Sequence, residues 1–308
     1  MLVSVLSVAA GLVLLTGGAA LLVSGAASAA LRLGMTPLLV GATVVAFGTS
    51  APELVVSVGA ALDGAGGIAV GNVVGSNVAN LALILGVAAL VRPIPTERAM
   101  LVRDLPVLGV ATLAAAACLA DGAVGRAEGA ALTAALVGVL AWSVRASRAE
   151  ASGPVDGVPD APGAPWRSAV GVAAGLAGLV AGAQMLVAGA TDLAAAAGVP
   201  NAVVGLTVVA VGTSLPELAT SVVAALRGDS AIAAGNVVGS NLFNALGILG
   251  VAALVAPLAA PGLRPLDLAA LLGATAVIGV MMWTGRRVGR AEGAVLVAGY
   301  AAYLTTMM

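Results

Sequence analysis

Two acidic residues lie inside long apolar runs of this sequence, and each ends a motif rich in hydroxyl groups. Glu53 ends Gly-Thr-Ser-Ala-Pro-Glu, residues 48–53, and Glu217 ends Gly-Thr-Ser-Leu-Pro-Glu, residues 212–217. Neither apolar run contains a Lys, Arg or His. A carboxylate at membrane depth is costly and is a functional-site hypothesis by default. Two such acids in two copies of one motif predict the two halves of a single cation site.

The residues before each glutamate have the spacing of oxygen ligands on one helical face. Thr49 and Ser50 precede Glu53 by four and three positions, so the three side chains share a face. Pro52 lacks an N–H and clashes with the preceding turn, which predicts that the helix opens beside Gly48. Carbonyl groups freed there become further oxygen ligands where they line an enclosed cavity. The second copy repeats the arrangement at Gly212, Thr213, Ser214, Pro216 and Glu217.

A second repeated motif adds more oxygen atoms. Gly-Asn-Val-Val-Gly-Ser-Asn occurs at 71–77 and again at 235–241, and an asparagine follows three positions after each copy. Helical spacing brings these side chains close together, namely Ser76, Asn77 and Asn80, and Ser240, Asn241 and Asn244. The two motif pairs offer carboxylate, hydroxyl, amide and carbonyl oxygens, with no nitrogen or sulfur donor. Ca²⁺ takes roughly 6–8 oxygens, and this set is able to supply them.

Composition restricts the class of protein. The chain has 308 residues, of which 61% are hydrophobic and 9% charged, so an integral membrane protein is the class that fits. A net charge of −1 gives no basic patch for nucleic acid. The absence of His and the single Cys118 exclude imidazole sites, an internal disulfide and thiolate clusters. No nucleophile or base motif accompanies the acids, so we expect neither enzyme activity nor a bound cofactor.

Ten apolar segments approach the length of about 20 residues that crosses the hydrocarbon. They are 3–31, 36–62, 69–91, 103–120, 126–145, 167–197, 200–226, 233–256, 266–284 and 290–307. The first is too long for the core of a signal peptide and predicts a retained helix. We therefore predict an all-α integral membrane protein of ten transmembrane helices, with broken helices at the bilayer midplane. Its parts are a first five-helix repeat at 1–146, a Pro- and Gly-rich cytoplasmic linker at 147–165, and a second five-helix repeat at 166–308.

The two halves are copies of one sequence. Residues 41–60 match 205–224 at 14 of 20 positions, and 69–86 match 233–250 at 12 of 18. Because each half has an odd number of spans, the second enters the membrane from the opposite side, which predicts an inverted repeat as in many secondary transporters.

The positions of the arginines predict the orientation of the chain. If both termini lie outside the cell, 11 arginines fall in inner loops and 2, Arg126 and Arg264, fall outside. The positive-inside rule therefore predicts a multi-pass protein of the cell membrane, with external termini and a cytoplasmic linker.

The motif pairs resemble the paired α-repeats of the sodium/calcium exchanger family, within the cation/Ca²⁺ antiporter superfamily. The motifs cover 36–91 and 200–256, and the ten-span layout extends the resemblance over the chain. The resemblance implies that Ca²⁺ is held chiefly by Glu53, Glu217, Thr49 and Thr213. It implies overlapping Na⁺ sites that add Ser50, Ser214, Ser76, Ser240, Asn80 and the carbonyl groups of Ala46 and Ala210. The long glycine-rich first and sixth segments resemble the pair that slides across the core to switch access.

The chain departs from the family pattern at one site position. Asn244 stands where several sodium-driven members carry an aspartate, so the site keeps two acids rather than three. The linker is also too short to hold the regulatory domain of animal members. Two ionised glutamates carry −2, which one Ca²⁺ or two Na⁺ neutralise, so a third Na⁺ predicts electrogenic exchange. Burial and like charge both disfavour ionisation, and we expect protons to compete with the cations.

Other interpretations stay open on sequence alone. A Ca²⁺/H⁺ or K⁺-coupled antiporter would use the same two acids, and a Ca²⁺-permeable channel is a more distant alternative. One chain carries both halves of the site, so we expect it to act as a monomer. Polar residues also join membrane helices, which is the role expected for Ser57, Ser221, Gln184 and Thr43. Ligand and brace are equally open for Asn72, Asn77, Asn236 and Asn241. Acids at segment ends, such as Asp104 and Asp267, are expected at the membrane interface.

Overall fold

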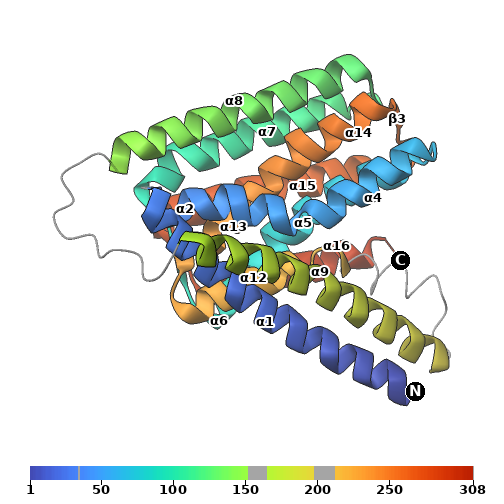
Figure 1. The fold of residues 1–308 in the computed structure, drawn as a ribbon. Helices are drawn as coiled ribbons and strands as arrows, with labels where there is room; N and C mark the ends of the chain where they lie inside the picture. The colour runs from blue at the N-terminus through green and yellow to red at the C-terminus, as the bar shows by residue number, and fades with distance from the viewer. Residues whose placement is uncertain (34, 152–164, 198–211, 308) are drawn as a thin grey trace.

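The structure, a computed structural model, describes residues 1–33, 35–151, 165–197 and 212–307. These ranges are helical apart from turns and four two-residue strands (Figure 1). The first half contains α1 (Leu2–Leu33), α2 (Pro37–Val40), η1 (Gly41–Val45), α3 (Ala46–Thr49), α4 (Ala51–Leu62), α5 (Gly66–Val78), η2 (Ala79–Ile84), α6 (Leu85–Val91), β1 (Ile94–Pro95), η3 (Met100–Asp104), α7 (Leu105–Cys118), β2 (Ala123–Val124) and α8 (Arg126–Ala151). The second half contains α9 (Pro165–Ala196), α12 (Leu215–Arg227), α13 (Ser230–Leu242), η5 (Phe243–Ile248), α14 (Leu249–Val255), β3 (Leu258–Ala259), α15 (Pro265–Gly285), β4 (Arg287–Val288) and α16 (Arg290–Thr305).

Seven helical stretches of the described chain are long and apolar enough to cross a bilayer. They are Leu2–Arg32, Gly66–Val91, Met100–Cys118, Arg126–Ala146, Trp166–Leu193, Ser230–Val255 and Pro265–Gly285. A bent pair, Pro37–Thr49 and Ala51–Leu62, gives an eighth span. Of the remaining two predicted segments, 290–307 forms the shorter helix α16, of 16 residues, and 200–226 is described only from residue 212. The protein is therefore a multi-pass helical membrane protein.

The spans Gly66–Val91 and Ser230–Val255 form the centre of the molecule. Most of their side chains are buried, whereas most of those on α8, α9 and α15 face the surroundings. Each central span contains a π-helical stretch, η2 or η5, and these begin 164 residues apart, at 79 and 243. Such stretches are frequent at functional sites, and these two hold Asn80 and Asn244. The sequence predicted the spans but not their π-helical turns, because hydrophobic periodicity does not record a local change in winding.

The helix that carries Glu53 is broken where the sequence predicted an opening. The pair Pro37–Thr49 and Ala51–Leu62 bends by 47°, and Ser50 at the bend has φ −83° and ψ 4°. Pro52 occupies the first turn after the bend, where a missing N–H costs nothing. Ser214 has nearly the same conformation, φ −89° and ψ 5°, directly before α12. The same local sequence therefore gives the same backbone conformation directly before both helices that carry the acids.

The two longest helices, α1 and α9, pack side by side along one edge of the molecule (Figure 1). Glycines recur every seven residues on both helices and are related by the 164-residue offset, at Gly11, Gly18 and Gly25 on α1 and Gly175, Gly182 and Gly189 on α9. A Cβ atom added to Gly18 would lie 2.8 Å from the carbonyl oxygen of Gly175. Small residues allow this backbone contact, which makes the pair one closely packed unit.

Two short antiparallel ribbons connect the halves. β1 pairs with β4, with Ile94 opposite Val288, and β2 pairs with β3, with Val124 opposite Leu258. The offset of 164 relates β1 to β3 and β2 to β4, from 94 to 258 and from 123 to 287. Each ribbon therefore pairs one strand of the first half with one strand of the second half, and the 164-residue offset converts one ribbon into the other.

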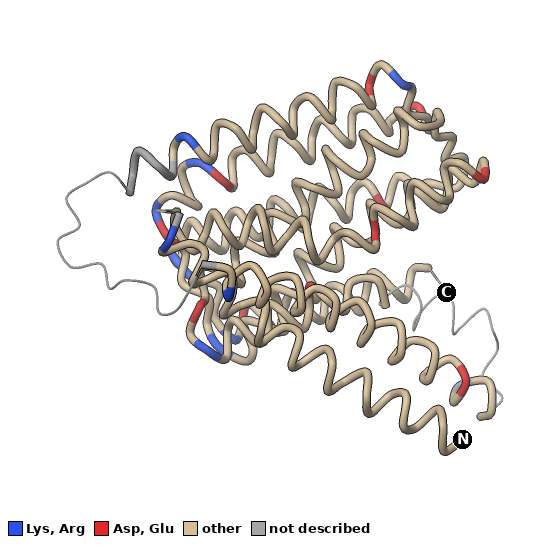
Figure 2. Tube along the Cα trace, viewed as in Figure 1, with Lys and Arg blue, Asp and Glu red and all other residues tan. Residues whose placement is uncertain are grey.

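Arginines gather at one end of the helices, at left in Figure 2. This arginine-rich face includes the last turns of α1 and α12 and the first turn of α16, with Arg32, Arg227 and Arg290. The start of α1 and the end of α16 lie at the opposite end, called here the termini face (Figure 1). The arginines are thus concentrated at one end of the helix axes, as expected for a protein that spans a membrane.

Candidate functional site

The two repeated motifs meet at the centre of the molecule through a crossed pair of hydrogen bonds. The Ser50 hydroxyl donates to Oε1 of Glu217 over 2.9 Å, and the Ser214 hydroxyl donates to Oε1 of Glu53 over 3.4 Å. Both glutamates are only 1% exposed. Each serine therefore links its own motif to the acid of the other half, and the two acids share one buried region.

Both acids lie in the first turn of a helix, Glu53 in α4 and Glu217 in α12. The first N–H groups of a helix have no partner within it, and their dipoles favour a nearby negative charge. No group of three or more acidic or sulfur ligands occurs in the described part of the chain. The two carboxylates thus accept from serine hydroxyls and lie at the starts of helices, and neither of these hydrogen bonds comes from a basic side chain.

Several buried oxygen atoms in this region have no hydrogen-bond partner within the described ranges. They are Glu53 Oε2, Glu217 Oε2, Asn77 Oδ1, Asn80 Oδ1, Asn241 Oδ1, Asn244 Oδ1 and Ser240 Oγ. η2 with Asn80 contacts α12, and η5 with Asn244 contacts α4, so each asparagine lies on an element beside the opposite acid. Burying such atoms without partners is costly, and a bound hard cation removes that cost.

Asn72 and Asn236 brace the helices that carry the acids. Asn236 Nδ2 donates to the Glu217 carbonyl over 3.4 Å and to Ser221 Oγ over 3.0 Å. Asn72 Nδ2 makes the matching bonds to the Glu53 carbonyl, 3.2 Å, and to the Ser57 hydroxyl, 2.9 Å. The sequence left both asparagines open between ligand and brace. Their constant spacing of 19 residues from each acid, 53 to 72 and 217 to 236, was the signal for a bracing pair.

The remaining predicted ligands differ between the halves. Thr49 is 0% exposed, with its hydroxyl 3.3 Å from the Ala46 carbonyl oxygen and 3.2 Å from Asn236 Oδ1. The Ala46 carbonyl also accepts from the Ser50 N–H over 2.9 Å, so it is not freed by the bend. The corresponding Ala210 lies outside the described residues. Thr213 is only partly buried, although the other predicted hydroxyl ligands, Ser50, Ser76, Ser214 and Ser240, are buried.

Thr213 is partly exposed because a cavity reaches it. The cavity has a volume of about 340 Å³ and lies between α4 and α9. Its lining includes Pro52, Val56, Gln184 and Thr213. At the corresponding places beside α12, Pro216 and Thr220 are buried. The surroundings of the two acids are therefore unequal, with more open space beside α4 than beside α12. α4 runs from the acids toward the termini face (Figure 1).

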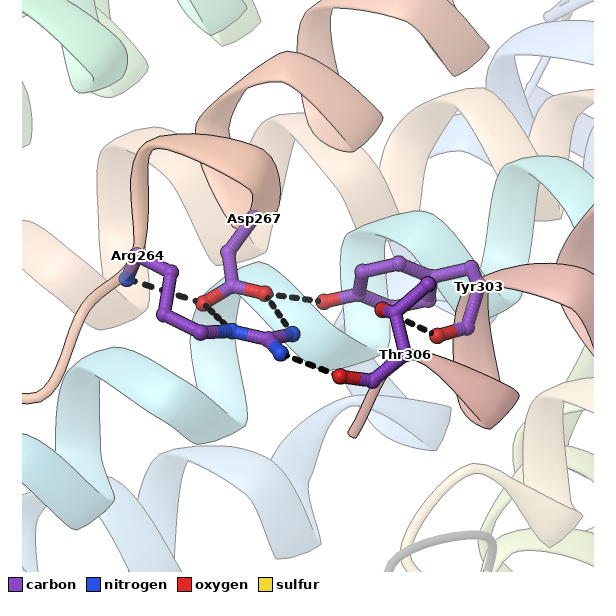
Figure 3. Close-up of polar contacts among 4 residues, drawn as sticks. All are labelled: Arg264, Asp267, Tyr303 and Thr306. Atoms are coloured by element: carbon purple, nitrogen blue, oxygen red, sulfur yellow. Dashed lines mark hydrogen bonds and ion pairs between the residues drawn. The ribbon is translucent and has the colours of Figure 1, made fainter. Parts of the chain in front are cut away.

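A third buried carboxylate lies away from this region and is fully paired (Figure 3). Asp267 Oδ1 accepts from Arg264 NH2 over 2.6 Å and from the Tyr303 hydroxyl over 3.0 Å. Its Oδ2 accepts from the Arg264 Nε and backbone N–H over 3.2 and 3.0 Å. Arg264 NH1 also donates to the Thr306 carbonyl over 2.6 Å. The sequence predicted Asp267 at a helix end, which is right, but not its 8% exposure or its attachment of α15 to α16.

Comparisons with known proteins agree over the whole chain. The sodium/calcium exchanger protein family matches residues 3–145 and 167–308. CaxA of Alkalimonas amylolytica, a candidate antiporter, is 38% identical over 312 residues, which cover 98% of each chain. Inner membrane protein YrbG of Escherichia coli (strain K12) is 34% identical over 319 residues, covering 96% of this chain and 94% of YrbG. A structure of the sodium-calcium exchanger NCX_Mj soaked with zero Na⁺ and Ca²⁺ is 31% identical, with a TM-score of 0.89 and 100% of both chains covered.

Proposed function

This chain belongs to the sodium/calcium exchanger protein family and is a membrane antiporter, and from that premise we propose that it exchanges Ca²⁺ for Na⁺ at the buried site of Glu53 and Glu217. The observation that carries the proposal is the pair of buried carboxylate oxygens, Glu53 Oε2 and Glu217 Oε2, that no group in the described structure satisfies. Antiport by alternating access needs one central site that either ion is able to occupy, and two facing acids supply it.

The ligands of the proposed site are those that the family resemblance implies, and the burial of most of them supports the assignment. Ca²⁺ is bound by the two glutamates, with Thr49 and Thr213 on either side. Na⁺ uses the same acids together with flanking hydroxyl, amide and carbonyl oxygens, from Ser50, Ser214, Ser76, Ser240, Asn80, Asn244, Ala46 and Ala210. The Ala46 carbonyl has a second lone pair for the ion beside its hydrogen bond from the Ser50 N–H. Carboxylate, hydroxyl, amide and carbonyl oxygens of this kind are the ligands that Ca²⁺ prefers in proteins. Ca²⁺ and Na⁺ are the cargo of the protein and not resident cofactors.

Charge sets the coupling of the exchange. Two ionised glutamates hold −2, so one Ca²⁺ or two Na⁺ leave the core neutral. A third Na⁺ leaves +1, and exchange of three Na⁺ for one Ca²⁺ then moves net charge across the membrane. The neutral Asn244, which replaces a third acid, keeps the balance of the site at two negative charges.

The proposed architecture is two inverted repeats of five helices, residues 1–146 and 166–308, joined by the linker 147–165. Three observations support it: the 164-residue offset of both motifs, the reciprocal pairing of the ribbons, and the matching backbone conformations of Ser50 and Ser214. The arginine-rich face is proposed to be cytoplasmic and the termini face external, by the positive-inside rule. YrbG carries the name of an inner membrane protein, which supports a place in the cell membrane.

Access to the site is proposed to alternate through movement of the α1–α9 pair. The glycine contacts make the two helices one unit, and that unit covers the two breaks differently. The cavity beside Val56 and Thr213 opens one side, and Pro216 is buried on the other. Sliding of the pair toward the opposite arrangement would close the cavity and expose the α12 side. One chain contains both routes, so we propose that a monomer is sufficient.

An assay of Ca²⁺ uptake into vesicles tests this function. Purified protein is reconstituted, and uptake is followed with an outward Na⁺ gradient, with a proton gradient, and with neither. We expect uptake only with the Na⁺ gradient. Three Na⁺ leaving for one Ca²⁺ entering carry one positive charge out of the vesicle, so an inside-positive potential should speed uptake and an inside-negative potential should slow it. Uptake driven by protons would identify a Ca²⁺/H⁺ antiporter, and uptake without any gradient would identify a channel. Repeating the Na⁺-driven assay with and without K⁺ distinguishes a K⁺-coupled antiporter from one that needs Na⁺ alone.

A further inference from the structure

Thr220 differs from other threonines in the helices of this chain. Five helical threonines donate their hydroxyl to the carbonyl four residues earlier, over 2.7–2.9 Å: Thr16, Thr43, Thr133, Thr275 and Thr284. Thr220 is 0% exposed, and its Oγ1 has no hydrogen-bond partner in the described parts of the chain. A buried polar atom without a partner is rare in native proteins and calls for an explanation.

Thr220 lies between the central acids and the arginine-rich face. It follows Glu217 by three residues on α12, which is about 4.5 Å along the helix axis. Seven residues further on, Arg227 NH1 donates to the Ala20 carbonyl over 2.9 Å and to the Ser24 hydroxyl over 2.6 Å. These bonds fasten the end of α12 to α1. The unpartnered hydroxyl is therefore on the segment that leads from the site to this face.

The corresponding position in the first half is apolar. Val56 follows Glu53 by three residues and lines the cavity between α4 and α9. The polar side chain near it is Gln184, which lies on the opposite wall, on α9. Gln184 corresponds to Ala20 of α1, 164 positions earlier. An uncharged polar side chain therefore lies near this pair of related positions in both halves: Gln184 on α9 faces the cavity beside Val56, and Thr220 itself is buried on α12.

We propose that Gln184 and Thr220 are ion ligands specific to one face each. Gln184 gives an amide oxygen to a cation that passes between the site and the termini face. Thr220 gives its hydroxyl oxygen to a cation that passes between the site and the arginine-rich face, when α1 has moved off α12. This inference rests on the proposed antiport function, and it assigns to Gln184 a role other than the helix contact expected from the sequence.

Uncharged ligands suit this task. A hydroxyl or amide oxygen replaces one water molecule of a hard cation such as Ca²⁺ or Na⁺. A carboxylate placed in a path of exit would hold the ion, whereas conduction requires binding that is weak enough for the ion to leave. The two side chains are therefore expected to affect how well each face collects its ion, without changing which ions the central acids accept.

Measurements of the KM for Ca²⁺ at each face test the inference. Right-side-out and everted membrane vesicles are loaded with Na⁺, so that Ca²⁺ meets the termini face in the first case and the arginine-rich face in the second. Thr220→Val should raise the KM in everted vesicles by about three- to tenfold, the loss expected for one neutral oxygen contact, and leave it unchanged in right-side-out vesicles. Gln184→Leu should do the reverse. Thr220→Ser should restore the wild-type value.

A matched control and a contrary result complete this test. Thr284→Val removes a helical hydroxyl that already bonds the Val280 carbonyl, so it should change neither KM. Equal changes at both faces after Thr220→Val, or no change at either, would overturn the assignment. The ion gradient that drives the wild type is used throughout. A proton-driven wild type would thus refute Na⁺ coupling while the comparison between faces still decides the inference.

Labelling of cysteines tests the same routes without transport. Cys118 is the single cysteine of the chain and is replaced by serine. Gln184→Cys and Thr220→Cys are then exposed to a membrane-impermeant thiol reagent from one face at a time. Gln184→Cys should react from the termini face, and Thr220→Cys only from the arginine-rich face. Reaction of Thr220→Cys from the termini face, or from neither face under any ion condition, would contradict the proposal.

Discussion

Asp267 and the pair Glu53–Glu217 are buried carboxylates with opposite surroundings. Asp267 accepts hydrogen bonds from Arg264 and Tyr303 at both of its oxygens, and it fastens α15 to α16 at the termini face (Figure 3). Glu53 and Glu217 each receive one serine hydroxyl at Oε1, and their second oxygens have no partner among the described residues. Arg264 thus neutralises Asp267, whereas the hydrogen bonds of Glu53 and Glu217 come from uncharged serines.

The difference separates a structural acid from a site for transported ions. A charge pair with complete hydrogen bonding is stable as it stands and gains nothing from a mobile ion. An unpaired buried carboxylate is tolerable only when something neutralises it. Thus burial alone does not distinguish the proposed cation site from Asp267. The carboxylate oxygens without a partner among the described residues do distinguish it, and mutations of the two kinds of acid should have different consequences.

Removing the charge of either central acid should have the largest effect. Glu53→Gln or Glu217→Gln keeps the shape of the side chain but halves the charge available for Ca²⁺, so uptake should fall to background. Membrane insertion should be retained. The measurement is Na⁺-driven Ca²⁺ uptake per amount of inserted protein. Robust uptake by either variant would place the site elsewhere.

Low pH should inhibit Ca²⁺ uptake strongly, because protonation also removes charge from the central glutamates. The ionised carboxylates bind Ca²⁺, so protonation removes charge from the pair and weakens binding as the pH falls from neutral to about 5. Raising the Ca²⁺ concentration should restore uptake, because protons and Ca²⁺ compete for the same oxygens. Initial uptake rates across a grid of pH and Ca²⁺ concentration measure this. A rate that does not change over the range would contradict it.

The crossed serines should have intermediate effects. Ser50→Ala and Ser214→Ala each remove a hydrogen bond to a buried carboxylate, which should weaken cation affinity by about tenfold. The Ser50 bond to Glu217 is 2.9 Å and the Ser214 bond to Glu53 is 3.4 Å, so Ser50→Ala should cost more. The KM for Ca²⁺ in reconstituted vesicles gives the comparison. If neither variant changes the KM, the serines do not orient the acids.

Asp267→Asn should have the smallest effect on transport and act on stability instead. It removes the charge that faces Arg264 but keeps the shape of the side chain, and the unfolding temperature should fall by about 2–4 °C. The KM and rate of Ca²⁺ uptake should stay at wild-type values. Thermal unfolding of the purified protein and vesicle uptake check the two parts. A loss of uptake without a loss of stability would give Asp267 a role in transport.

The sequence predicted the class of fold and the residues of the candidate site because both depend on local patterns. Apolar length identified the spans, and Pro52 predicted the bend next to Ser50. The crossed hydrogen bonds, from Ser50 to Glu217 and from Ser214 to Glu53, could not be predicted from the sequence, because they depend on how the two halves pack together. The same holds for the two bracing asparagines, although their repeated spacing from the acids was visible.

Other features depend on tertiary packing that no local pattern records. The family resemblance implied the Ala46 carbonyl as a ligand, and the sequence did not show that this carbonyl also accepts from the Ser50 N–H across the bend. The cavity beside Thr213 and the burial of Thr220 distinguish two stretches whose sequences are nearly the same. The inequality comes from where the α1–α9 pair rests on the core, and a repeat in the sequence predicts only what the halves share.

The reciprocal ribbons have a consequence for the origin of the chain. β1 pairs with β4 and β2 pairs with β3. Since β1 corresponds to β3 and β2 to β4, each ribbon contains one strand of each kind, and its two strands come from different halves. Two identical half-chains inserted in opposite directions would complete both ribbons and both serine–carboxylate crossings with no linker at all. A half-length chain that inserts into the membrane in both orientations would therefore contain every part of the proposed ion pocket as a dimer.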